Sequence, residues 1–240
     1  MQLVCDNLSF EYSDNGTIVL DRLSFTMQGP GFHAVFGPSG VGKTSLARII
    51  SAGITGYTGQ LHLKEIKTIL YSYNMERLPG WSNIGNILRQ VTPSGCESLL
   101  EELITVFDLD SLMHSRFARL SLGQQNRVNL IRYLVQDFDL LILDESLANV
   151  DEKLRHTILL HIKERFSDKM FLSISHNLME IATFCKKIVV LGSRKEEGRE
   201  YLLQGMDVQR DREVAQDIAQ DMLPDRKRLD EVMLEIMNAC

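Results

Sequence analysis

Cysteine is scarce in this sequence. Only four of the 240 residues are cysteine, and none of them forms a C-x-x-C pair. A disulfide framework or a zinc site is therefore not expected, and the thiols are expected to stay reduced.

Long apolar runs are also missing. The longest are short stretches such as residues 140–143 and 188–191, whereas a membrane-spanning helix needs roughly 20 apolar residues. Residues 1–10 show no basic stretch followed by an apolar run, so no signal peptide is expected. The sequence predicts a chain that does not cross a membrane by itself.

Basic charge is in deficit. The chain has 26 Lys and Arg against 32 Asp and Glu, a net charge of −6. This balance argues against nucleic acid as the main partner. Hydrophobic residues (44%) and charged residues (24%) are at ordinary globular levels. A chain of 240 residues is expected to form one core domain with an inserted or appended lobe.

Turn residues divide the chain into predicted strands and helices. Strands are expected over 3–12, 19–27, 32–36, 66–73, 140–143, 170–174, 187–191 and 199–204. Helices are expected over 43–52, 97–107, 121–135, 151–166 and 177–185. Alternating strands and helices predict an α/β fold with a mainly parallel sheet, and no strand is expected between 76 and 135.

This pattern predicts three parts. Residues 1–75 and 136–205 would form the core, with an antiparallel N-terminal β part, and residues 76–135 would form an inserted helical subdomain. Residues 206–240 read as a tail of two amphipathic helices hinged at Pro224. The apolar stripe of this tail is expected to pack on its own domain. The alternative is that it packs on the partner subunit or on another protein, as a dimer-stabilising or regulatory element.

A glycine-rich run between a predicted strand and a predicted helix matches the phosphate-loop pattern G-x-x-x-x-G-K-[ST]. The phosphate loop consists of Gly37, Pro38, Ser39, Gly40, Val41, Gly42, Lys43 and Thr44, followed by Ser45. Its glycines let backbone N–H groups surround phosphate oxygens at a helix N-terminus. Lys43 would bridge the β- and γ-phosphates of ATP, and Thr44 would bind Mg²⁺.

Two acidic residues end the apolar strand 140–143. Asp144 lies where a carboxylate at the C-terminal edge of the sheet can reach the metal ion. Glu145 follows directly and suits the general base that polarises the attacking water. A guanine-reading Asn-Lys-x-Asp motif and an Arg-rich kinase lid are both missing from the sequence, which leaves ATP hydrolysis as the expected reaction.

Further motifs follow in the same order as in the ATPase subunits of ABC transporters, which this chain resembles over residues 1 to about 205. Residues 120–128, LSLGQQNRV, are similar to that family's signature segment, usually LSGGQQQRV. Residues 148–151 resemble its SALD loop, Ser175-His176 resembles its switch histidine, and Tyr12 lies where the family stacks an aromatic ring on adenine.

The resemblance implies a P-loop NTPase core and a head-to-tail dimer of ATPase subunits. ATP on the phosphate loop of one subunit would be covered by the signature segment of the other. His176 would contact the γ-phosphate and hold the water, and Asp151 would link the two sites. The residues implied to act on the partner's ATP are Ser121, Leu122, Gly123 and Gln124.

Three positions depart from the family pattern. Leu122 replaces a glycine of the signature segment, and Ser146 replaces the proline after the acidic pair. Asn74 replaces the glutamine of the family's Q-loop, so its carboxamide is one methylene shorter. Asn74 remains a candidate metal ligand, either directly or through a bridging water.

The segment after Asn74 narrows the resemblance. Residues 76–81, ERLPGW, resemble the DRLLPW segment of nitrate, sulfonate, taurine and thiamine-precursor importer subunits, and Asn86 matches the asparagine of their ENV motif. Trp81, the only tryptophan, is expected either at the permease surface or in the core of the helical subdomain.

The resemblance implies an energy subunit that is cytoplasmic and bound to the inner face of the cell membrane through permease subunits, with a solute-binding protein as an indirect partner. The alternative is a soluble ABC-type ATPase without transport. Repair and chromosome members insert a long coiled coil, and translation members carry two cassettes, whereas this chain shows neither feature.

Overall fold

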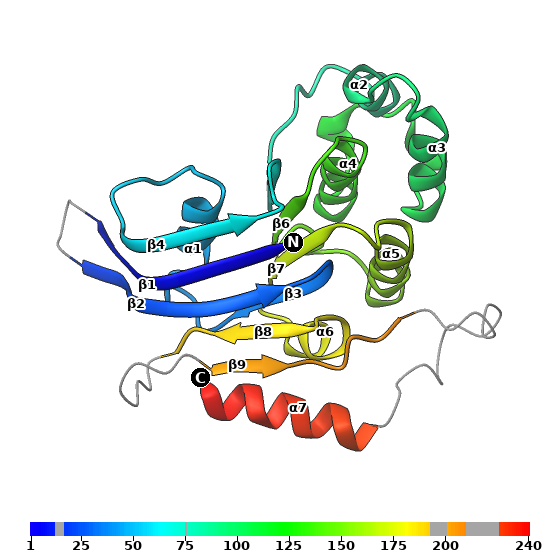
Figure 1. Ribbon diagram of the computed structural model, residues 1–240. Helices are drawn as coiled ribbons and strands as arrows, with labels where there is room; N and C mark the ends of the chain where they lie inside the picture. The colour runs from blue at the N-terminus through cyan, green and yellow to red at the C-terminus, as the bar shows by residue number, and fades with distance from the viewer. Residues whose placement is uncertain (13–16, 75, 193–200, 210–225) are drawn as a thin grey trace.

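The computed structural model describes residues 1–12, 17–74, 76–192, 201–209 and 226–240, which form two β-sheets with helices around them (Figure 1). The start of the strand expected at residue 199 falls outside these ranges, as do most of the first expected tail helix and its hinge at Pro224.

The smaller sheet is antiparallel and has the order β2-β1-β4. It consists of β1 (Gln2–Tyr12), β2 (Thr17–Gln28) and β4 (Thr58–Lys64). The sequence did not predict β4. No side chain of β4 is fully buried, so the strand lacks a strong apolar pattern and is defined by its pairing with β1.

The larger sheet has the order β5-β6-β7-β3-β8-β9 and is parallel except for β9, which runs antiparallel to β8. Its strands are β3 (Gly31–Phe36), β5 (Ile69–Tyr73), β6 (Leu140–Asp144), β7 (Met170–Ile174), β8 (Lys187–Val190) and β9 (Tyr201–Gln204). The strand expected from residue 66 therefore begins only at Ile69. Strands β6 and β7 are buried throughout, as central parallel strands usually are.

The two faces of the larger sheet belong to different apolar clusters. Leu140 and Ile142 pack with the smaller sheet and with α1 (Lys43–Ile50). Leu141 and Leu143 point the other way, toward α5 (Glu152–Arg165) and α6 (Leu178–Phe184). Successive strand residues alternate between faces, so one short strand joins both clusters.

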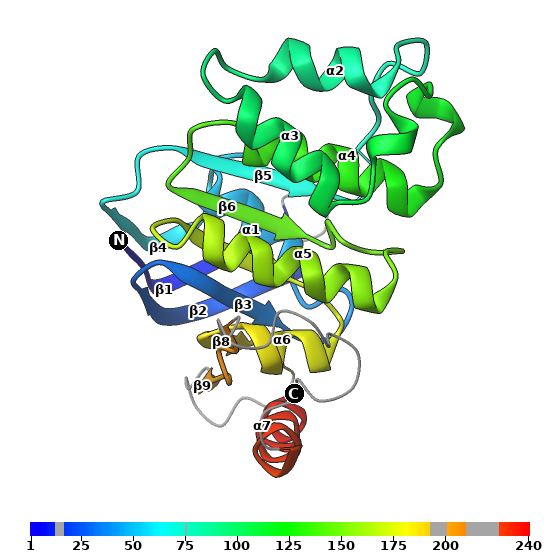
Figure 2. The same cartoon turned by 90° about the vertical axis from the view of Figure 1, so that its right-hand side faces the viewer.

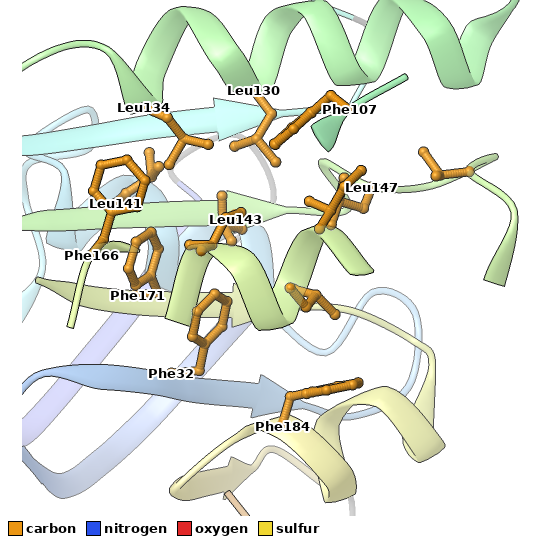
Figure 3. Close-up of a cluster of buried hydrophobic side chains, with 14 of the residues drawn as sticks. Phe32, Phe107, Leu130, Leu134, Leu141, Leu143, Leu147, Phe166, Phe171 and Phe184 are labelled. Carbon is orange, nitrogen blue, oxygen red and sulfur yellow. The ribbon is translucent and has the colours of Figure 1, made fainter. Parts of the chain in front are cut away.

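Figure 3 shows the second cluster, in which side chains from the strands and from the covering helices interleave. Phe32 and Phe171 stack with ring centroids 4.6 Å apart. Phe138 extends this aromatic group, with its ring centroid 5.7 Å from that of Phe171 and 6.0 Å from that of Phe166. This packing fixes the edge of the sheet at which the acidic residues lie.

Figure 2 shows a helical group beyond β5, at that edge of the larger sheet. It contains α2 (Ile84–Val91), α3 (Glu97–Val106) and α4 (Leu122–Leu134). Helix α2 was not predicted; it is a short element whose Asn83 cap accepts a hydrogen bond from the Asn86 N–H at 2.8 Å. Whether residues 76–135 behave as a separate subdomain stays a prediction.

The last helix, α7 (Arg226–Ala239), packs on this chain's own α6 and β9. Leu229, Val232, Ile236 and Ala239 form its buried face. Among the helices that the described residues form, none is both long and apolar enough to span a bilayer.

Candidate nucleotide site

The phosphate loop connects β3 to α1 and is held close to the end of β8. A Cβ atom at Gly37 would lie 2.1 Å from the carbonyl oxygen of Leu191, so only glycine fits there. The Leu191 N–H also donates to the Phe36 carbonyl at 2.8 Å. These contacts fix the start of the loop against the sheet.

Lys43 is the first residue of α1. Its ammonium donates to the carbonyl oxygens of Gly37 and Pro38, each at 2.7 Å. Burial lowers the pKa of Lys43, while the carboxylates of Glu145 and Asp144 oppose this effect. The ammonium therefore lies at the phosphate loop and within the electrostatic field of both acids.

Asp144 ends β6 and is joined to two neighbouring elements. One carboxylate oxygen accepts hydrogen bonds from the Thr44 hydroxyl at 3.0 Å and from the Tyr71 phenol at 2.8 Å. Burial, followed by the hydrogen bond to Asp144, raises the pKa of Tyr71, so the phenol keeps its proton and donates it. Thr44 and Asp144, predicted to share a metal ion, are thus adjacent.

Glu145 adopts a left-handed backbone conformation, with φ of 53°, which is uncommon for a residue with a side chain. Its N–H donates to the Ile174 carbonyl at 2.9 Å, and its carbonyl accepts from the Ala148 N–H at 3.0 Å. The carboxylate meets Nδ1 of His176 at 3.0 Å. The structure thus joins the predicted general base to the predicted switch histidine.

Lys43, Thr44, Asp144 and Glu145 line one cavity of about 750 Å³, whereas His176 contacts Glu145 from outside its lining. Its lining includes Tyr12, whose hydroxyl lies 3.0 Å from the Ser45 hydroxyl. The predicted residues that line the cavity are Tyr12, Ser39, Gly40, Gly42, Lys43, Thr44, Ser45, Asn74, Asp144 and Glu145. Gly37, Pro38 and Val41 belong to the phosphate loop but are not among the residues that line the cavity.

Asn74 follows β5, and its N–H donates to the Asp144 carbonyl at 2.9 Å. Its side-chain oxygen accepts a hydrogen bond from the Asn126 amide at 3.0 Å. Asn74 therefore lies between the acidic strand end and helix α4.

The signature segment lies apart from this cavity. Ser121 caps α4 and forms a reciprocal pair of hydrogen bonds with Gln124, a capping box. Leu122 is 50% exposed. A Cβ atom at Gly123 would lie 2.1 Å from the Asn149 carbonyl, so glycine is required there. Residues 121–124 are not among those that line the cavity.

Asp151 is exposed at the start of α5 and accepts hydrogen bonds from the N–H groups of Lys153 and Leu154. In this chain it is a helix cap. Its role between two subunits stays a prediction.

Sequence reasoning missed several residues of the cavity wall. Tyr71, Tyr73, Val19 and Arg48 line the cavity. Tyr71 could have been found from its place near the C-terminal end of a strand that pairs with the Asp144 strand, because parallel neighbours share that edge. Arg48, one turn along α1 from Thr44, carries no comparable signal.

The fold and the site together define a nucleotide-binding domain of the phosphate-loop class. The match to the family model described as ABC transporter spans residues 20–148, more than half of the chain. The chain therefore belongs to the ABC transporter family and forms its ATP-binding, ATPase-type domain. The resemblance drawn from the motifs is confirmed at this level.

Several curated proteins are similar to this chain. It is 27% identical over 202 residues to the spermidine/putrescine import ATP-binding protein PotA of Borreliella afzelii, covering 77% of this chain and 58% of that protein. It is 29% identical over 208 residues to the molybdenum import ATP-binding protein ModC of Saccharophagus degradans, covering 78% and 56%. The chain thus spans little more than half the length of these relatives.

Solved structures share the fold. A bacterial Atm1-family ABC exporter with ATP bound matches with a TM-score of 0.70 at 22% identity, covering 79% of this chain and 37% of that one. A metal-chelate type ABC transporter in an inward-facing conformation matches with a TM-score of 0.67 at 18% identity, covering 84% and 82%. The predicted fold class is confirmed.

Proposed function

We propose that this chain is the ATP-hydrolysing subunit of a membrane importer for small solutes. The observation that carries the proposal is that Lys43, Thr44, Asp144 and Glu145 line one cavity, while His176 contacts Glu145 from outside its lining. Each of these groups has a distinct task in phosphoryl transfer to water.

The tasks follow from the geometry. Lys43 would exchange its bonds to the loop carbonyls for bonds to the β- and γ-phosphates. Glu145 would take the proton of the water that attacks the γ-phosphorus as the bond to ADP breaks. His176, at 3.0 Å from the Glu145 carboxylate, would orient that carboxylate and contact the γ-phosphate.

The oxygen donors fit Mg²⁺. Thr44 and Asp144 supply a hydroxyl and a carboxylate 3.0 Å apart, and Mg²⁺ typically takes one or two protein ligands together with phosphates and waters. The described residues contain no group of three or more His, Cys, Asp and Glu that could hold a metal ion without the nucleotide. When bound, Mg²⁺ would neutralise charge on the β- and γ-phosphates.

The working unit would be a head-to-tail pair of ATPase subunits, a homodimer or a pair of related chains. Residues 121–124 lie outside their own chain's cavity, which leaves them available for the ATP of a partner. Asp151, exposed at the N-terminal cap of α5, would then link the two sites.

The proposed partners are permease subunits at the inner face of the membrane and, through them, a solute-binding protein. Import is supported by the similarity to PotA and ModC, which are import ATP-binding proteins. The nitrate, sulfonate, taurine and thiamine-precursor group is the finer proposal, and it rests on residues 76–81 and Asn86. The relatives named above import polyamines and molybdenum. The coarser proposal, which does not depend on residues 76–81, is therefore only that the solute is a small molecule.

Two variants of the purified protein test the ATPase step. Lys43→Ala should lose nucleotide binding, because the phosphates lose their main cation. Glu145→Gln should bind ATP normally yet hydrolyse it at least about 100-fold more slowly, since an amide does not accept the proton. Fluorescent-nucleotide titration and phosphate release separate the two effects. Normal turnover in Glu145→Gln would refute the assignment.

Uptake measurements test the import step. Cells lacking this gene should lose uptake of one solute from a radiolabelled panel of nitrate, taurine, a thiamine precursor, spermidine and molybdate. The wild-type gene should restore that uptake, whereas the Glu145→Gln gene should not. Unchanged uptake of every solute, together with measurable ATPase activity, would favour the soluble ATPase without transport.

A further inference from the structure

Asn126 lies on α4 and is almost completely buried, with 3% of its surface exposed. Its amide nitrogen donates to the side-chain oxygen of Asn74 at 3.0 Å and to the Ala148 carbonyl at 2.8 Å. The two protons of one amide group are therefore divided between two segments that are far apart in the sequence.

Both acceptors belong to segments that leave the C-terminal edge of the sheet. Asn74 lines the nucleotide cavity and bonds through its N–H to the Asp144 carbonyl. Ala148 lies three residues after Glu145, and its N–H donates to the Glu145 carbonyl. Asn126 is thus connected, through one residue in each case, to the main chain of Asp144, the predicted metal ligand, and of Glu145, the predicted general base.

The hydrogen bond between Asn74 and Asn126 shows which way the short side chain of Asn74 points. The side-chain oxygen of Asn74 accepts a hydrogen bond from the Asn126 amide, so the Asn74 carboxamide points toward α4. Asn129, one turn along the same helix, donates to the Glu76 carbonyl at 2.8 Å, and Arg132 pairs with the Glu76 carboxylate at 3.1 Å. Helix α4 therefore contacts the chain on both sides of residue 75.

We propose that Asn126 is a positioning residue for ATP hydrolysis, and that Asn74 serves the reaction through its bond to Asn126 rather than as an independent metal ligand. This inference rests on the proposed ATPase function. The pair would keep the Asp144–Glu145 strand end and the loop containing Ala148 in fixed register with α4, which carries the signature segment.

A double-mutant cycle tests the proposal. Each of Asn74→Ala and Asn126→Ala should lower kcat by about fivefold, the worth of a neutral hydrogen bond, with the KM for ATP within about twofold of wild type. The double variant should be no slower than the slower single variant, because the residues act as one unit. A fall of about 25-fold in the double variant would show independent roles and overturn the proposal.

The control is Asn129→Ala, which removes an equally buried amide of α4 that bonds outside the nucleotide cavity. Its kcat should stay within about twofold of wild type. An equal loss in Asn129→Ala would mean that any buried amide on α4 matters, and would overturn the proposal. Thermal melting is measured for every variant.

If Asn126→Ala does not fold, Asn126→Ser, which keeps one donor, takes its place in the cycle. Failure of both Asn126 variants to fold, while Asn129→Ala folds, would overturn the proposal in favour of a purely structural role. A wild-type protein without ATPase activity would instead refute the proposed function itself, so the two failures are distinguishable.

Discussion

At the scale of single residues, His33 is a buried titratable group in the strand that leads into the phosphate loop. Its side chain has no exposed surface, and Nε2 lies 3.2 Å from the Gly29 carbonyl. Burial is the largest influence and lowers the pKa of His33 to about 4, against an ordinary value of 6.5. Lys186 and Lys187 add to this effect, whereas the Gly29 bond and Asp207 oppose it.

This lowered pKa predicts a loss of stability in acid. The unfolded chain takes up a proton at His33 near pH 6.5, whereas the folded chain resists it until about pH 4. The contribution of His33 to the free energy of unfolding is therefore fully present above pH 6.5. As the pH falls from 6.5 toward 4, protonation of His33 in the unfolded chain lowers the free energy of unfolding by about 3 kcal/mol.

Urea unfolding of the wild type and of His33→Gln between pH 7 and pH 4.5 measures this contribution. The glutamine variant does not titrate at this position, so its free energy of unfolding should fall less steeply with acid, and the other groups cancel in the comparison. Parallel curves for the two proteins would show that His33 is not the titrating group.

At the scale of single elements, the connection from β5 to α2 presents Trp81 to solvent, with 81% of its surface exposed. The alternative that placed Trp81 in the core of the helical part is therefore wrong. Single exposed apolar side chains are common on protein surfaces, but tryptophan is a preferred interface anchor.

Trp81→Ala is accordingly expected to uncouple transport while leaving the isolated subunit intact. Little apolar surface is buried at this site, so the melting temperature and the basal ATPase rate should stay close to wild type. Met237→Ala on α7, another exposed apolar residue at 62% exposure, is the matched control and should leave transport unchanged. Uptake assays in cells, combined with melting curves, check the result; a large loss of stability in Trp81→Ala would contradict it.

At the scale of the whole molecule, α7 lies at one side of the fold, where it packs on α6 and β9 (Figure 2). Its described part packs on the parent domain through Leu229, Val232, Ile236 and Ala239. This favours the plain packing role of the tail over the regulatory one. The other predicted tail helix, over residues that include Val214 and Met222, lies outside the described residues.

Paired substitutions on α7 measure the stability that this packing supplies. Ile236 has no exposed surface, so Ile236→Ala should lower the free energy of unfolding by about 3 kcal/mol. Leu234, at 58% exposure on the same helix, should tolerate alanine within about 0.5 kcal/mol. Equal effects in urea unfolding would mean that α7 does not pack as described.

The sequence by itself determined the parts of the site that are contiguous in the chain. The phosphate loop and the Asp144–Glu145 pair each depend on neighbouring residues, because loop conformation and strand ends are local properties. The apolar runs of β6 and β7 likewise marked buried strands, because burial on both faces leaves a continuous apolar pattern.

Only the tertiary structure decided the contacts between distant segments. Strand β4 exists through pairing with β1, Tyr71 meets Asp144 across two strands, and Asn126 meets Asn74 from a helix 52 residues away. The exposure of Trp81 was equally undecided, since the same residue type serves cores and interfaces. Such outcomes depend on which surfaces the folded chain brings together, and no local propensity or period encodes that choice.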